Sequence, residues 1–138
     1  MSTRTNLKPS QVIPSPQGNP ANSGSMAANI TSAPTVLQSI SQVSYSVSWT
    51  GTTPVGALSV QVSNDYSINP NGTVNNAGTW NTMTLQYNGS AVTTIPVTGN
   101  SGSGLIDITD TAAYAIRLVY TATSGTGSLV AIINGKVS

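Results

Sequence analysis

Three aspartates are the only acidic residues of this chain, and two of them are spaced for chemistry. Asp107 and Asp110 lie three residues apart in "DITD", near the end of an expected strand, while Asp65 opens a long polar loop. A glycosidase needs two carboxyl groups that face one sugar bond, so Asp107 and Asp110 are the candidates for that reaction. Aspartate is also a common turn residue. We favour the simpler interpretation, in which Asp110 caps a turn and Asp107 faces solvent or pairs with Arg117.

The residues that are missing exclude most other catalytic chemistry. The sequence contains no histidine and no cysteine. Histidine-based triads and metal sites, thiolate nucleophiles and zinc ribbons are therefore excluded. The loop "NDYSINPNGTVNNAGTW" offers oxygen ligands for calcium, but it carries one carboxylate and its spacing does not match an EF-hand. We expect no enzyme activity, no cofactor and no metal.

The same loop carries two aromatic residues that could bind a sugar. Tyr66 and Trp80 could stack on a glycan while the neighbouring asparagines form hydrogen bonds with its hydroxyl groups. The alternative is a long polar connection whose Trp80 packs at the edge of the core. Exposure of Tyr66 or Trp80 would favour a glycan-binding module or receptor-binding knob.

The composition is that of a protein that associates with neighbours. Only 5% of the 138 residues are charged and the formal net charge is +1, whereas 38% are hydrophobic. Nearly uncharged surfaces tend to associate. Four basic residues are too few for a nucleic-acid binder, and no apolar run is long enough to span a membrane. The start of the chain does not resemble a signal peptide.

From Thr35 onward, apolar and polar residues alternate with a period of two. In "VSYSVSW" and "ALSVQVS" the apolar residues share one face and the serines share the other, which indicates half-buried strands. Asn88-Gly89 predicts a two-residue hairpin turn. About eight such segments and no amphipathic helix predict an all-β fold, a single antiparallel, jelly-roll-like sandwich over residues 35–138.

The expected core takes one face of each strand. Its members are Tyr45, Val47, Trp49, Leu58, Val60, Val62, Leu85, Ile95, Leu105, Ile108, Ile116, Leu118, Tyr120, Leu129, Ala131 and Ile133. The segment "YAIRLVYTATSGTGSLVAIINGK", residues 114–136, reads as a hairpin that turns at Ser-Gly-Thr-Gly. Alternation places Arg117 on its outer face, where an aspartate or a neighbouring subunit would meet it.

Residues 1–34 differ from the rest of the chain. Five of the eight prolines occur here and no alternation is visible. Because proline restricts φ and removes a donor, we expect an extended, irregular N-terminal arm.

The C-terminal part resembles a known group of proteins. "AIRLVYTATSGTGSLVAIINGK", "LSVQVSND" and the Trp80 of "TWNTMTLQ" resemble segments of small β-sandwich virion proteins of tailed bacteriophages. The resemblance covers about residues 56–137. It implies a head-decoration, minor capsid or tail-associated structural protein, and it carries no catalytic residue.

These observations predict a non-enzymatic protein of a phage particle, most simply a capsid decoration or minor capsid protein. Its expected location is the virion, and its expected partners are the major capsid protein or other virion proteins and further copies of itself, a trimer being the simplest guess. The N-terminal arm would anchor it. The expected contact residues are Arg4, Lys8, Val12, Ile13 and Arg117.

Overall fold

The computed structural model describes residues 6–15, 22–37, 40–87, 89–108 and 111–136. All regular elements in these residues are β-strands, and the strands of the main sheet pair antiparallel. The prediction of an all-β, sandwich-like fold is confirmed.

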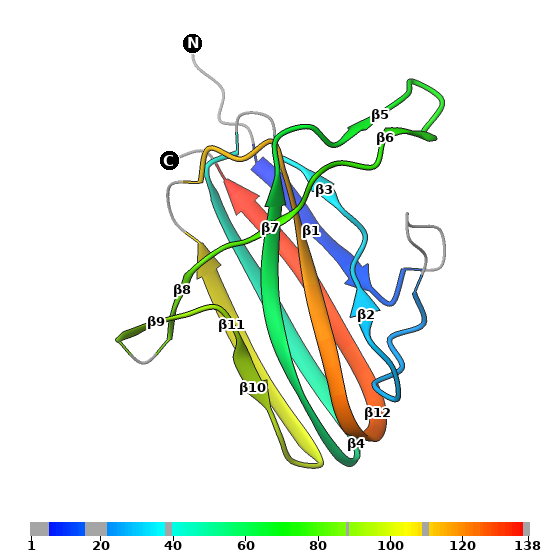
Figure 1. Ribbon diagram of the computed structural model, residues 1–138, viewed down its shortest axis with the longest axis vertical. Coiled ribbons are helices and arrows are strands. Elements are labelled where there is room, and N and C mark those ends of the chain that lie inside the picture. Colours follow the sequence, from blue (N-terminus) through cyan, green and yellow to red (C-terminus); the bar gives the residue numbers. More distant parts are fainter. Residues whose placement is uncertain (1–5, 16–21, 38–39, 88, 109–110, 137–138) are drawn as a thin grey trace.

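Two strands of 22 residues organise the molecule. β4 (Gln42–Ser63) and β12 (Ala115–Lys136) pair with each other along their full length, from Ala115↔Ser63 to Lys136↔Gln42. Figure 1 shows that both strands double back at the lower end of the molecule, so the paired ribbon folds over on itself. Each half of the ribbon then belongs to a different layer of the sandwich.

Residues 114–136 therefore form a folded-over strand and not a hairpin. The halves 115–122 and 128–136 each pair with β4 and not with each other, so this prediction is wrong. At the bend, Gly125 has φ +83°, and an added Cβ there would meet the carbonyl of Thr53 on the neighbouring strand. The glycines of Ser-Gly-Thr-Gly, Gly125 and Gly127, are required because two backbones bend together in close contact, and not because the chain reverses beside itself.

Layer A contains residues 42–50 of β4 and residues 128–136 of β12, which pair with each other. β11 (Ser101–Ile108) pairs with residues 43–50 of β4, and β1 (Asn6–Ile13) pairs with residues 131–136 of β12. The order across layer A is β1, β12, β4 and β11. β1 and β11 are thus its two edge strands.

Layer B contains the other two halves and four short strands. β2 (Ile30–Thr31) and β3 (Thr35–Val36) pair with β12, whereas β7 (Asn81–Thr82) and β10 (Ile95–Val97) pair with β4. Two small hairpins lie outside both layers. One joins β5 (Ser67–Ile68) to β6 (Val74–Asn76), and the other joins β8 (Leu85–Tyr87) to β9 (Ser90–Val92). In the β8–β9 hairpin Tyr87 pairs with Ser90, and Gly89 of the predicted Asn88-Gly89 turn has a positive φ, +79°, whereas Asn88 lies outside the described residues.

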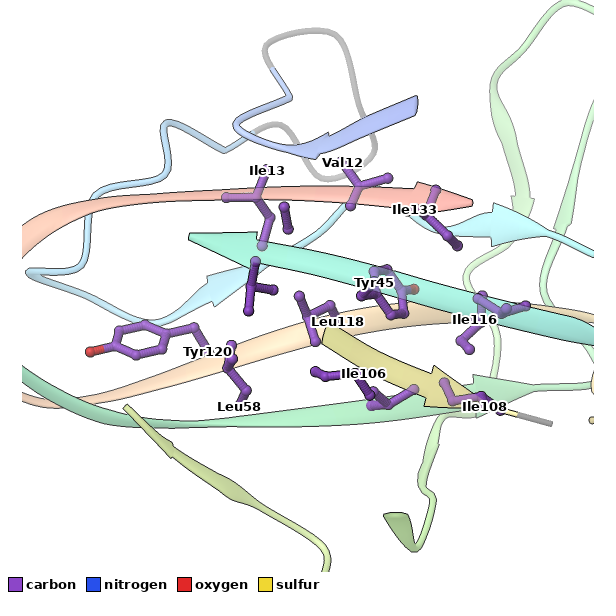
Figure 2. Packing of buried hydrophobic residues seen from close by; sticks show 14 of the residues in the cluster. Val12, Ile13, Tyr45, Leu58, Ile106, Ile108, Ile116, Leu118, Tyr120 and Ile133 are labelled. Carbon is purple, nitrogen blue, oxygen red and sulfur yellow. The ribbon is translucent and has the colours of Figure 1, made fainter. Parts of the chain in front are cut away.

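The core lies between the layers and follows the predicted alternation with one clear exception. Figure 2 shows the side chains of Tyr45, Leu118 and Ile133, among others, turned toward the interior. Twelve of the predicted core residues are buried, and Trp49, Val62 and Ile95 are partly buried against them. Leu105, however, is 62% exposed. Ile106 and Ile108 point inward from the same uninterrupted strand, so Leu105 must point outward.

The N-terminal segment contributes a second set of core residues. Ile13 and Met26 have no exposed surface, and Val12 and Ile30 are nearly as buried. Although the sequence predicts an irregular arm, its described residues include β1 and β2, which add strands to layer A and layer B. The described part of the segment is thus continuous with the sandwich.

Candidate interaction face and the 64–80 loop

The outer surface of layer A carries a regular pattern of small and apolar side chains. Because Tyr45 and Val47 of β4 point into the core, Ser44, Ser46 and Ser48 point outward. The register places Ser46 between Leu105 of β11 and Ile132 of β12. We call the outward side chains of β11, β4 and the 128–136 half of β12 the serine face.

A shallow groove follows β4 across the serine face. In its middle, Ser46 and Ser48 form the floor, Leu105 and Ser103 form one wall, and Val130 and Ile132 form the other. The groove continues toward Thr50 and Ser128 at one end and toward Gln42 and Lys136 at the other. Leu105 is 62% exposed and Ile132 is 37% exposed. Exposed apolar side chains that line one groove are typical of a surface that another molecule covers.

Charge is confined to one end of this face. Asp107 and Lys136 lie on opposite sides of the groove there, both exposed, with Ser44 and Asn134 between them. Among the described side chains of the serine face, Asp107 and Lys136 are the only charged ones. The remainder of the face has only hydroxyl, amide and aliphatic groups.

Arg117 lies on the outer surface of layer B, on the face that alternation predicts. Its Nε donates a 2.8 Å hydrogen bond to the side-chain oxygen of Gln61, its partner in the register. Its guanidinium carbon lies 4.2 Å from the centre of the Trp80 ring. Partial burial lowers the pKa of Arg117, but an arginine remains charged at neutral pH. Arg117 is therefore engaged within its own chain by an amide and an aromatic ring.

The two aromatic residues of the candidate glycan site lie against each other, Tyr66 buried and Trp80 partly exposed. Tyr66 is 6% exposed, and its ring lies 5.6 Å from that of Trp80 with the planes tilted by 53°. The Trp80 indole N–H donates to the carbonyl of Ala77, and Arg117 covers one face of the ring. The structure thus brings Tyr66, Trp80 and Arg117 into one cluster that holds the loop on layer B, and Arg117 occupies one face of the Trp80 ring on which a sugar would stack.

Asp65 closes the base of the same loop. Its Oδ1 accepts hydrogen bonds from the Thr79 amide at 2.6 Å and from the Ser63 hydroxyl at 2.8 Å. These bonds lower the pKa of Asp65, the Thr79 amide having the largest effect. The loop that offers oxygen ligands for calcium thus has its one carboxylate occupied by its own backbone and by the Ser63 hydroxyl. No group of three or more acidic, histidine or cysteine residues that could hold a metal occurs in the described residues.

The four expected contact residues of the arm are in very different positions. Arg4 lies outside the described residues, and Lys8 belongs to β1, although its side chain is outside them as well. Val12 and Ile13 are 4% and 0% exposed and belong to the core. In this structure they contact the protein's own strands and are not accessible to a second subunit.

The catalytic alternative gains no geometric support. Asp107 is exposed on the open serine face, on an edge strand, and Asp110 lies outside the described residues. The described part of the chain contains no helix that could cross a membrane.

The serine face was not singled out from the sequence, although the signal for it was present. Alternation assigns Ile132 outward once Ala131 and Ile133 are assigned inward. Leu105 and Ile108, three positions apart in one strand, cannot share a face. A strict count of positions therefore identifies two exposed aliphatic residues, and only the strand pairing reveals that they lie on either side of Ser46.

Comparison of this chain with models of known protein families, with curated proteins and with solved structures gives no match.

Proposed function

We propose that this protein is a non-enzymatic structural subunit of a bacteriophage particle, either a capsid decoration protein or a minor capsid protein. The observation that carries the proposal is the serine face, a nearly uncharged sheet surface with an exposed leucine and an exposed isoleucine. Such a face suits a protein that works in permanent contact with other subunits. The resemblance of residues 56–137 to phage virion proteins supplies the kind of assembly.

The rest of the surface supports the same proposal. Further large apolar side chains are exposed away from the serine face, namely Val55, Ile68, Val74 and Tyr114. Ile68 and Val74 are partners in the β5–β6 hairpin, which extends away from the sandwich in Figure 1. A subunit held among neighbours has use for more than one apolar contact, whereas a free monomer exposing them is prone to aggregate.

The proposed anchor is shorter than the whole N-terminal arm. Val12 and Ile13 belong to the core, so the anchor falls to the residues that precede β1, Arg4 among them. Contacts with capsid proteins would then combine these residues with the exposed apolar surface.

The experiment that tests the function is to purify particles from the source culture on a density gradient and to identify their proteins by mass spectrometry. We expect peptides of this chain in the same fractions as the major capsid protein, in a constant ratio to it. If the chain occurs only in the fractions that contain no particles, the proposal is wrong.

A deletion of residues 1–5 tests the anchor separately. It spares β1 and the core, so the domain should unfold at an unchanged temperature while fewer copies remain on each particle. Unchanged occupancy would assign the particle contact to the sandwich surface alone. Deletion of residues 1–34 cannot answer this question, because it also removes core residues such as Ile13 and Met26.

A further inference from the structure

The serine face has a groove and a ridge side by side, in the same register. The groove is the column of small outward residues on β4, and the ridge is the column formed by Val130 and Ile132 on the adjacent half of β12. Ser48 pairs with Val130, and Ser46 pairs with Ile132. The two features therefore run parallel, next to each other and at the same height along the strands.

We propose that the serine face binds a second copy of this chain, in a dimer whose two-fold axis runs parallel to the strands between β4 and β12. Rotation about that axis exchanges groove and ridge, so each copy inserts its ridge into the partner's groove. Ile132 then lies over the partner's Ser46. The partner's exposed Leu105 flanks Ile132 on one side, and the partner's ridge flanks it on the other. A groove that fits a feature of its own molecule is the requirement for an isologous interface.

The two charges of the face agree with this partner. Lys136 pairs with Gln42 in the register, one outward position beyond the Ser44 that pairs with Asp107. In the dimer the partner's Lys136 lies over Gln42, which is one strand (about 4.8 Å) across and about 7 Å along the strand from Asp107, so both side chains have to extend toward each other across the interface to pair. The contact forms twice, and no like charges of the described residues meet. An unrelated apolar partner would leave both charges unmatched.

The size of layer A is sufficient for a specific, modest interface. The three strands of the serine face and the adjoining edge strand β1 make four strands of about eight residues, which together cover roughly 500 Å² in projection on each copy. Two such faces bury on the order of 1,000 Å², the lower limit for a biological interface. Two sheets that pack in this way keep their strands within about 30° of each other, as in the two layers of a sandwich. The inference concerns the chain alone, so it stands or falls independently of the particle.

The test is the oligomeric state of the purified protein, measured by sedimentation velocity over a range of concentrations. We expect a monomer–dimer equilibrium in the wild type. Ile132→Glu places a charge in the partner's groove and should weaken association about tenfold or more. Ile68→Glu is the matched control, because Ile68 is also exposed but lies on the β5–β6 hairpin, and it should leave the dimer intact. Near-ultraviolet circular dichroism verifies that both variants are folded.

An exchange of charges tests the orientation of the two copies. Asp107→Lys and Lys136→Asp should each weaken the dimer, and the chain carrying both changes should regain the wild-type affinity, because the two contacts are restored with their signs reversed. A wild type that is monomeric at every concentration would overturn the proposal. So would an oligomer that Ile132→Glu leaves intact, or one in which the double exchange is no better than either single change.

Discussion

At the scale of single residues, the most informative side chains are polar groups that the fold has buried. The hydroxyls of Tyr45 and Tyr120 and the indole nitrogen of Trp49 are enclosed without a hydrogen-bond partner in the described residues. Burial raises the pKa of the Tyr45 phenol, so the group remains neutral. In a chain without phenylalanine, tyrosine fills core positions that need a large ring, and its hydroxyl is buried together with the ring.

Tyr45→Phe should therefore stabilise the protein. Leaving a buried hydroxyl unpaired costs about 1–3 kcal/mol, so removing it should raise the free energy of unfolding by about 1 kcal/mol. Urea denaturation measures this change. Tyr114→Phe is the control, because Tyr114 is exposed and the change should have an effect of less than about 0.5 kcal/mol. A clear loss of stability in Tyr45→Phe would reveal a hidden partner such as a buried water.

The Asp65 carboxylate should make the 64–80 loop sensitive to acid. Its pKa is lowered in the folded state, so its contribution to stability is complete above the unfolded pKa of about 3.9 and disappears as the pH falls through the lower folded value. The amide proton of Thr79, which donates to Asp65, reports this titration in NMR spectra. We expect a midpoint below about 3.9 in the wild type. In Asp65→Asn the chemical shift of the Thr79 amide should no longer titrate in this range. A wild-type midpoint at or above the ordinary aspartate pKa would show that the hydrogen bonds from Thr79 and Ser63 do not stabilise the Asp65 carboxylate.

At the scale of elements, the bend of the β4–β12 ribbon decides the architecture. Without it, two strands of 22 residues would form one long flat ribbon. Glycines permit the bend because the two backbones approach too closely for side chains. An added Cβ at Gly51 would meet the carbonyl of Thr126, and one at Gly125 would meet that of Thr53.

Gly125→Ala should consequently be far more disruptive than the same change elsewhere. Gly72 has a similar φ, +88° against +83°, but nothing lies within 4 Å of its absent Cβ. Gly72→Ala should lower the free energy of unfolding by about 1 kcal/mol, the cost of a positive φ for a residue with a side chain. Gly125→Ala adds a collision with the backbone and should lower the free energy of unfolding by a further 1–3 kcal/mol or so, as measured by urea denaturation. Equal losses in the two variants would mean that the bend tolerates a side chain.

At the scale of the whole molecule, the N-terminal segment belongs to the body of the protein as far as its described residues extend. β1 forms an edge of layer A, and Ile13 has no exposed surface. β1 is also the fourth strand of layer A, where it extends the proposed dimer face beyond the serine face. The segment thus has a structural role whatever its first residues do in an assembly.

Ile13→Ala tests this role. Removing most of a fully buried isoleucine should lower the free energy of unfolding by about 2–4 kcal/mol. Ile68→Ala, the same change at a side chain that is 48% exposed, should change it by less than about 0.5 kcal/mol. If thermal or urea unfolding shows both variants to be equally stable, the segment does not pack as described.

The sequence by itself determined the class of the fold, most of the core and the outward position of Arg117. Each of these follows from alternation, a local property of the strand that any single segment reveals. Alternation also predicts the outward position of Leu105, because Ile106 and Ile108 occupy the other face.

Only the tertiary structure decided what long-range pairing controls. The bend in residues 114–136, the burial of Val12 and Ile13, and the ring of Trp80 over Arg117 all depend on partners far away in sequence. The serine face is of the same kind. Leu105, Ser46 and Ile132 come from three strands, and they form one surface because the hydrogen-bond register places them in one row.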